Sequence, residues 1–147
     1  MLLTLIAASI FASAQDAGPG STPETVIFIE DIAYGQESER QRLDILHPDD
    51  VRQPRPAIVH IHSGGWYTGG KGGEKTFAML QAFADAGYVA VSIGYRLSGE
   101  AVFPAAVEDC KLAIRWLRAN ADAHGIDPER IGAIGASAGG HLAAMLA

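Results

Sequence analysis

One serine of the chain stands in a pattern that suits nucleophilic chemistry. Residues 135–139 read Gly-Ala-Ser-Ala-Gly, follow a short apolar run and open a segment rich in small residues. A serine hydroxyl attacks a carbonyl only when it is held beside a base and backbone donors. The glycines fit a sharp strand-to-helix turn, a nucleophile elbow, because such a turn leaves little room for side chains. The pattern therefore predicts Ser137 as a nucleophile.

A second glycine-rich segment, residues 62–66, reads His-Ser-Gly-Gly-Trp and follows an apolar run. Attack of Ser137 on a carbonyl creates an oxyanion, which backbone N–H groups stabilise. One donor is expected to be the amide of Ala138, directly after the nucleophile. We expect the amides of Gly64 and Gly65 to supply the others, since glycines let a substrate approach the backbone. The two segments together predict an oxyanion hole.

Nearby side chains have competing interpretations. We expect His62 to brace the loop by hydrogen bonding, whereas Trp66 either lines an acyl pocket or packs against the protein. His141 lies one helical turn after Ser137, where it is poorly placed to act as its base, so we interpret it as structural. His60 and His62 share one side of a strand, but no third ligand has matching spacing, so we expect no metal.

Strands and helices alternate along the chain. Expected strands cover residues 26–29, 42–46, 57–62, 88–93 and 131–134, and expected helices cover 76–86, a segment after Pro104 and a segment after Ser137. The first two strands are suited to pair as an antiparallel edge. The alternation that follows predicts an α/β fold, a mostly parallel sheet with helices on both faces. Right-handed crossovers place both glycine-rich segments at the same edge of that sheet.

Seven motifs in order resemble the α/β-hydrolase superfamily, and more narrowly the acetyl esterase/lipase group that includes hormone-sensitive-lipase-like and bacterial feruloyl-esterase-like domains. They lie at residues 62–66, 70–71, 95–97, 104–109, 116–117, 127–131 and 135–141. One departure is Ser63, which stands where that group usually has a glycine. The resemblance implies a serine esterase without metal or cofactor. It also implies a catalytic acid and a histidine in loops after later strands.

The chain divides into three expected segments. Residues 1–14 resemble a signal peptide, because an apolar run of about ten residues precedes Ala-Ser-Ala. That run is too short to span a bilayer, so we expect no stable membrane anchor and a secreted or periplasmic protein. No Lys or Arg precedes the run, so either the N-terminal amine supplies the charge or the true start lies upstream. Residues 15–24 form a flexible lead-in, and 25–147 form the N-terminal part of an α/β-hydrolase domain.

The ending of the sequence indicates a domain truncated after the nucleophile elbow. Residues 142–147 show no helix cap and no polar tail. We therefore expect the catalytic acid and histidine to lie beyond residue 147. Because the base is missing, we also expect the fragment alone to be inactive.

Other function classes fit the sequence less well. The net charge of −6 without a basic cluster argues against nucleic-acid binding. Residues 65–71 approach a phosphate-binding loop, but Gly72 replaces the Ser or Thr that binds magnesium. Cys110 is the one cysteine and is expected in the core. Whether Arg96 and Asp109 form an ion pair stays open.

The expected function is hydrolysis of carboxylic esters through a serine acyl-enzyme. The resemblance and the export signal favour small acyl esters, acetyl or feruloyl, on carbohydrate. Two alternatives remain: a peptidase of the same fold, and a non-catalytic binding or scaffold protein on it. The acyl and alcohol specificity and the oligomeric state stay open.

Overall fold

The computed structural model describes residues 25–147, so the expected signal peptide and lead-in lie outside the described residues. Five strands form one sheet in the order β1-β2-β4-β3-β5. Their bounds are β1 (Val26–Ala33), β2 (Arg42–Pro48), β3 (Arg55–Ile61), β4 (Val89–Ile93) and β5 (Ile126–Gly135). The strands β3, β4 and β5 are parallel, and β2 pairs antiparallel with β1 and β4. The predicted sheet and its antiparallel edge are confirmed.

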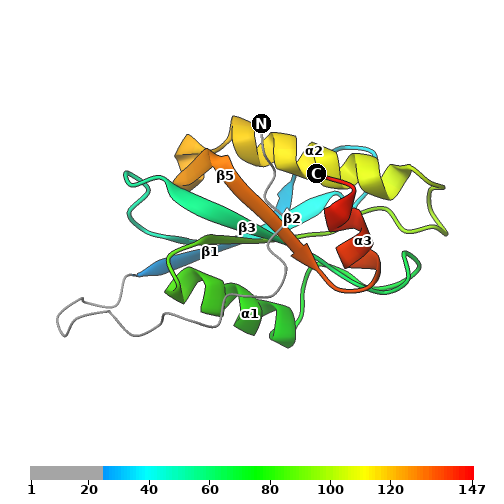
Figure 1. Cartoon of the computed structure of the whole chain (residues 1–147), viewed down its shortest axis with the longest axis horizontal. Coiled ribbons are helices and arrows are strands. Elements are labelled where there is room, and N and C mark those ends of the chain that lie inside the picture. The colour runs from blue at the N-terminus through cyan, green and yellow to red at the C-terminus, as the bar shows by residue number, and fades with distance from the viewer. Residues whose placement is uncertain (1–24) are drawn as a thin grey trace.

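Helices cover both faces of the sheet (Figure 1). The helix α1 (Glu74–Asp85) lies on one face, and α2 (Ala105–Ala119) and α3 (Ala138–Ala144) lie on the other. A short 3-10 helix, η1 (Asp122–His124), precedes β5. The helix α1 begins two residues before its expected start, because the glycine-rich loop ends at Gly73, which takes the N-cap position. None of the helices in the described part of the chain is long and apolar enough to cross a membrane.

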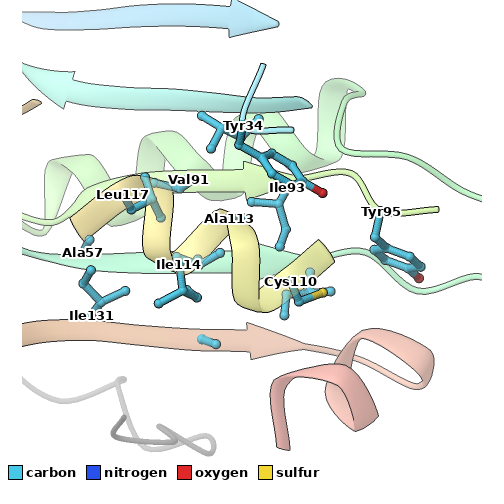
Figure 2. Close-up of a cluster of buried hydrophobic side chains, with 14 of the residues drawn as sticks. Tyr34, Ala57, Val91, Ile93, Tyr95, Cys110, Ala113, Ile114, Leu117 and Ile131 are labelled. Atoms are coloured by element: carbon cyan, nitrogen blue, oxygen red, sulfur yellow. The ribbon is translucent and has the colours of Figure 1, made fainter. Parts of the chain in front are cut away.

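The larger core lies between α2 and the sheet (Figure 2). One apolar face of α2 is buried there and includes Val107, Cys110, Ile114 and Leu117, so the expected core position of Cys110 is confirmed. Every residue of β4 is buried, as expected of a strand covered on both faces. A smaller cluster forms under α1, where Leu80 packs with Leu46 and Ile58. Each such side chain contributes about 1.5–3 kcal/mol by leaving water, so both helices are held mainly by burial.

The start of β5 differs from expectation. The segment 127–130 precedes the expected strand 131–134 but lies within β5 as a bulge. Opposite β3, the register jumps from Ile126 to Ile131 while β3 advances only from Arg55 to Ala57. The side chain of Asp127 accepts the amide of Glu129 at 3.0 Å, which stabilises the turn locally. The strand β5 therefore begins earlier than expected and continues around a local turn.

The carboxyl ends of the parallel strands are level. Ile61 pairs with Ile93 on one side and with Gly135 on the other. The segments that follow these residues therefore leave the sheet together at one edge. This places the two glycine-rich segments beside each other, although they are far apart in the sequence.

Candidate active site

Ser137 lies at the turn between β5 and α3, as the motif predicts. Its backbone has φ 52° and ψ −120°, a region that costs a non-glycine residue about 1–3 kcal/mol. The side chain is exposed, as a nucleophile requires. A Cβ atom on Gly139 would overlap the carbonyl oxygen of Ile61, and one on Gly135 would overlap the backbone of Gly139. Close packing against β3 thus forces glycine on both sides of the serine.

The glycine-rich loop after β3 folds back on itself. Gly64 has φ 122°, and its carbonyl accepts the amides of Tyr67 and Thr68, both at 3.0 Å. The next part of the loop reaches α3, where the ring of Trp66 meets that of His141 edge-on at 5.3 Å. The loop therefore contacts the helix that follows Ser137.

Three backbone N–H groups at this edge of the sheet are unpaired within the described residues. Within residues 25–147, the amides of Gly64, Gly65 and Ala138 have no hydrogen-bond partner. Unpaired backbone amides beside a nucleophile are the usual donors of an oxyanion hole. They are the same groups that the sequence analysis selected, and the structure places their segments at one edge of the sheet.

His62 and Tyr95 hold the beginning of the loop. The Nδ1–H of His62 donates to the carbonyl of Ser63 at 2.7 Å. The His62 ring stacks on Tyr95 with centroids 4.1 Å apart, and the Tyr95 hydroxyl donates to the His62 carbonyl at 2.9 Å. Burial lowers the pKa of His62, and burial together with nearby Cys110 raises the pKa of Tyr95 to about 12. Both side chains are therefore neutral near pH 7.

The role of Tyr95 in holding the loop was missed from the sequence. The available signal was a tyrosine two residues beyond the buried strand β4, where its hydroxyl can reach the backbone that follows the neighbouring strand β3.

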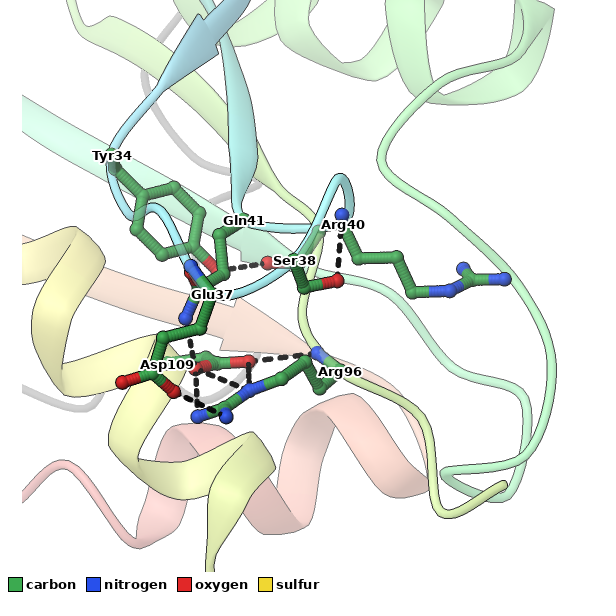
Figure 3. Close-up of polar contacts among 8 residues, drawn as sticks. Tyr34, Glu37, Ser38, Arg40, Gln41, Arg96 and Asp109 are labelled. Carbon is green, nitrogen blue, oxygen red and sulfur yellow. Dashed lines mark hydrogen bonds and ion pairs between the residues drawn. The ribbon is translucent and has the colours of Figure 1, made fainter. Parts of the chain in front are cut away.

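Arg96 and Asp109 form the ion pair that the sequence left open (Figure 3). Asp109 is buried in α2 and accepts the Arg96 backbone amide at 2.8 Å as well as its guanidinium. The side-chain amide of Gln41 also donates to Asp109, at 2.7 Å. Bonding to Asp109, which outweighs burial, raises the pKa of Arg96. This pair fastens the segment after β4 to α2.

A cavity of about 390 Å³ opens beside the elbow. Most of its lining is apolar, and the residues are Trp66, Arg96, Ser98, Ala101, Phe103, Ala106, Val107, His141 and Leu142. Trp66 therefore does both things that the sequence analysis considered, since it packs on His141 and lines the cavity. The amide of Ser98 donates to the Trp66 carbonyl at 2.8 Å, which joins the two walls.

The remaining histidines near the site have structural partners. The His141 amide donates to the Ser137 carbonyl at 3.0 Å at the start of α3, but the His141 ring packs on Trp66 and, among the described side chains, makes no hydrogen bond to that of Ser137. His60 Nδ1–H donates to the Ser92 hydroxyl at 3.2 Å, and burial followed by the neighbouring His62 lowers the pKa of His60 to about 4. The described residues contain no group of three or more His, Cys, Asp or Glu side chains arranged to hold a metal ion.

Comparison with known proteins gives consistent matches. The BD-FAE family model matches residues 43–147. A probable carboxylic ester hydrolase, LipM of Mycobacterium tuberculosis, is 36% identical over 80% of this chain and 27% of its own length. Esterase B from Lactobacillus Rhamnosis has a TM-score of 0.74 and 29% identity, covering 86% of this chain and 40% of that one. A truncated carbohydrate esterase from gut microbiota has a TM-score of 0.66 and 33% identity, covering 86% and 45%. The chain thus spans less than half the length of these relatives.

Proposed function

The chain belongs to the BD-FAE family, and on that basis we propose that it carries the nucleophile and the oxyanion donors of a carboxylic ester hydrolase. The observation that carries the proposal is the meeting of two features at one sheet edge. Ser137 is exposed at a strained turn, and the unpaired amides of Gly64, Gly65 and Ala138 belong to the segments beside it. Relatives named as esterases support the same reaction class.

In the proposed reaction, the Ser137 oxygen bonds to the ester carbonyl carbon while a base accepts the serine proton. The carbonyl electron pair moves to oxygen, where the three amides stabilise the negative charge. Collapse breaks the bond to the alcohol oxygen, which takes the proton, and leaves an acyl-serine. Water then repeats the steps and releases the acid.

We infer that the base and its acid partner come from parts of the protein other than residues 25–147. Among the described residues no imidazole is hydrogen bonded to Ser137. The relatives that match are more than twice as long as the matched region, which leaves room for both groups.

The proposed substrates are small acyl esters, acetyl or feruloyl, on carbohydrate, reached by a secreted or periplasmic enzyme. The apolar cavity beside Trp66 suits an uncharged group next to the reacting carbonyl. The carbohydrate esterase among the similar structures supports a sugar as the alcohol part. The signal-like residues 1–14 support export.

The test uses the full-length gene product with p-nitrophenyl acetate and a fluorophosphonate probe. We expect Ser137→Ala to lower kcat by about 10⁴-fold or more and to abolish labelling. Ser38→Ala is the matched control, because Ser38 is half-buried in the loop between β1 and β2 and lies outside the site.

Equal labelling of Ser137→Ala and wild type would rule out the nucleophile assignment. A folded wild type that neither turns over esters nor reacts with the probe would favour the scaffold alternative. Faster cleavage of peptide anilides than of esters would favour the peptidase.

A further inference from the structure

Lys71, which ends the phosphate-loop-like pattern, is bound to the sheet. Its ammonium lies 2.6 Å from Asp44 Oδ1 and 2.7 Å from Asp31 Oδ1. The Lys71 side chain is only 18% exposed. Both carboxylates belong to the antiparallel strands β2 and β1, and Lys71 belongs to the loop between β3 and α1. The lysine therefore fastens the far end of the glycine-rich loop to the opposite part of the sheet.

The two strands are shaped for this contact. Asp44 is a buried carboxylate between the apolar residues Leu43 and Ile45 of β2. In β1, the register shifts between Ile29 and Ile32, and Asp31 takes φ 58°. This bulge turns the Asp31 amide toward Asp44 Oδ1, which accepts it at 2.9 Å. One carboxylate oxygen thus receives a backbone donor and the ammonium.

The backbone of Lys71 is also held by a hydrogen bond from the sheet. The Ser92 hydroxyl in β4 donates to the Lys71 carbonyl at 2.8 Å. Because Ser92 uses its proton in this bond, His60 Nδ1–H in β3 donates to the Ser92 oxygen at 3.2 Å. Residues of three strands, β1, β2 and β4, therefore contact Lys71, and His60 of β3 supports it indirectly through Ser92.

The carboxylates of Asp31 and Asp44 favour the charged form of Lys71. Burial opposes the charged form, but the bonds from Asp31 and Asp44 outweigh it and raise the pKa of Lys71. The bond from Lys71 and its charge lower the pKa of Asp31. The ammonium therefore stays charged and paired, which makes it a poor ligand for a phosphate.

The loop needs such an anchor because much of it is glycine. Ordering each residue costs about 1–2 kcal/mol of backbone entropy, and oxyanion donors act only when they are ordered before the reaction. The loop is fixed at its start by His62 and Tyr95 and at its end by Lys71. Gly64 and Gly65 lie between these two fixed points.

We propose that Lys71 and Asp44 are positioning residues of the esterase reaction, which hold the loop so that the amides of Gly64 and Gly65 keep their place beside Ser137. This inference rests on the proposed function. The two side chains touch neither the substrate nor the reacting atoms. Losing the anchor lets the amides drift, and a displacement of about 1 Å costs about 10²-fold in rate.

The test compares Lys71→Met and Asp44→Asn in the full-length protein. Methionine keeps an unbranched apolar side chain, and asparagine keeps the shape of the carboxylate. We expect kcat for p-nitrophenyl acetate to fall about 10²-fold with KM little changed, and hydrogen exchange to accelerate in residues 62–70. Lys71→Arg keeps the charge and should recover part of kcat. Lys75→Met is the matched control, since Lys75 is exposed on α1 and should behave as wild type.

Wild-type kcat and exchange in either folded variant would overturn the inference. Exchange that accelerates across the whole sheet would also overturn it, because the pair would then support the fold alone. If wild type folds but does not hydrolyse esters, the proposed function fails. In that case the exchange of residues 62–70 still decides whether Lys71 orders the loop.

Discussion

The two glycine-rich segments of this site use glycine for different physical reasons. In the elbow, Gly135 and Gly139 are needed because backbone from β3 and α3 occupies the space a side chain would take. In the loop after β3, Gly64 is needed because its φ of 122° is strained for other residues, and its close neighbour is the backbone of the same loop. The elbow is therefore defined by packing against the sheet, and the loop by its own turn and its polar anchors.

Because of this difference, substitutions in the two segments should have different effects on stability and activity. A change that disturbs the elbow must push apart β3 and β5, so it acts on the whole fold. A change in the loop moves exposed backbone, so it acts first on the oxyanion donors. Substitutions in the elbow should therefore lower mainly stability, and substitutions in the loop should lower mainly activity.

The largest effect is expected for Gly139→Ala. The new Cβ would overlap the Ile61 carbonyl and crowd the His62 carbonyl, and neither group is a flexible side chain. We expect the free energy of unfolding to fall by about 3 kcal/mol, measured by chemical denaturation of the full-length protein. Gly70→Ala is the control, because nothing lies within 4 Å of its added methyl. Equal denaturation midpoints for the two variants would contradict the packing argument.

In contrast to Gly139→Ala, Gly64→Ala should lower activity strongly and stability only slightly. Its Cβ would overlap the Thr68 carbonyl, and the loop can relieve this by moving into solvent. We expect kcat to fall about 10²-fold, the cost of losing an oxyanion donor, with a loss of unfolding free energy of about 1 kcal/mol. Steady-state kinetics and denaturation check the two values. If Gly64→Ala is as unstable as Gly139→Ala, the loop is not an independent unit.

Tyr95→Phe tests one anchor of the loop. The change removes the hydroxyl that donates to the His62 carbonyl at 2.9 Å but keeps the ring that stacks on His62. We expect a loss of about 1 kcal/mol in the free energy of unfolding, because the buried carbonyl loses its donor. Tyr67→Phe is the control: that side chain is 74% exposed and should change stability by less than about 0.5 kcal/mol. A larger loss of unfolding free energy in Tyr67→Phe than in Tyr95→Phe would contradict the role of Tyr95 as an anchor.

The smallest effect is a dependence of stability on pH through His60. Burial and His62 lower its pKa in the folded protein from 6.5 to about 4. Between these values the unfolded chain binds more protons, so the stabilising contribution is complete above pH 6.5 and is lost as the pH falls toward 4. We expect His60→Gln to show a shallower loss of unfolding free energy from pH 7 to pH 4.5. An unchanged slope would show that His60 does not contribute.

Local patterns predicted most of the fold. The apolar runs of β3 and β4 and the apolar face of α2 follow from spacing alone, because each repeats a period within one element. The motif at residues 135–139 also located the strand-to-helix turn. Its glycines are visible in the sequence, and they are needed because a Cβ at either position would overlap backbone atoms. The bulge at 127–130 was read as a strand boundary, because turn residues do not reveal whether pairing resumes beyond them.

Contacts between distant segments were not predictable in the same way. Lys71 reaches Asp44 and Asp31 only because β1 and β2 lie on the outer side of β4, an order that the sequence does not state. Its position beside glycines resembled a phosphate-binding loop, an alternative that Gly72 already argued against. The available signal was Asp44 between Leu43 and Ile45, since a buried carboxylate needs a partner.

The packing of α2 against the sheet gives the molecule a built-in chemical reporter. Cys110 is the one thiol of the sequence, is fully buried, and has its pKa raised to about 12 by burial and by Asp109. A thiolate is the form that alkylating reagents attack, so the closed molecule should resist them near neutral pH. Modification of this sulfur then counts the molecules in which α2 has lifted from β3 and β4, without any added fluorophore.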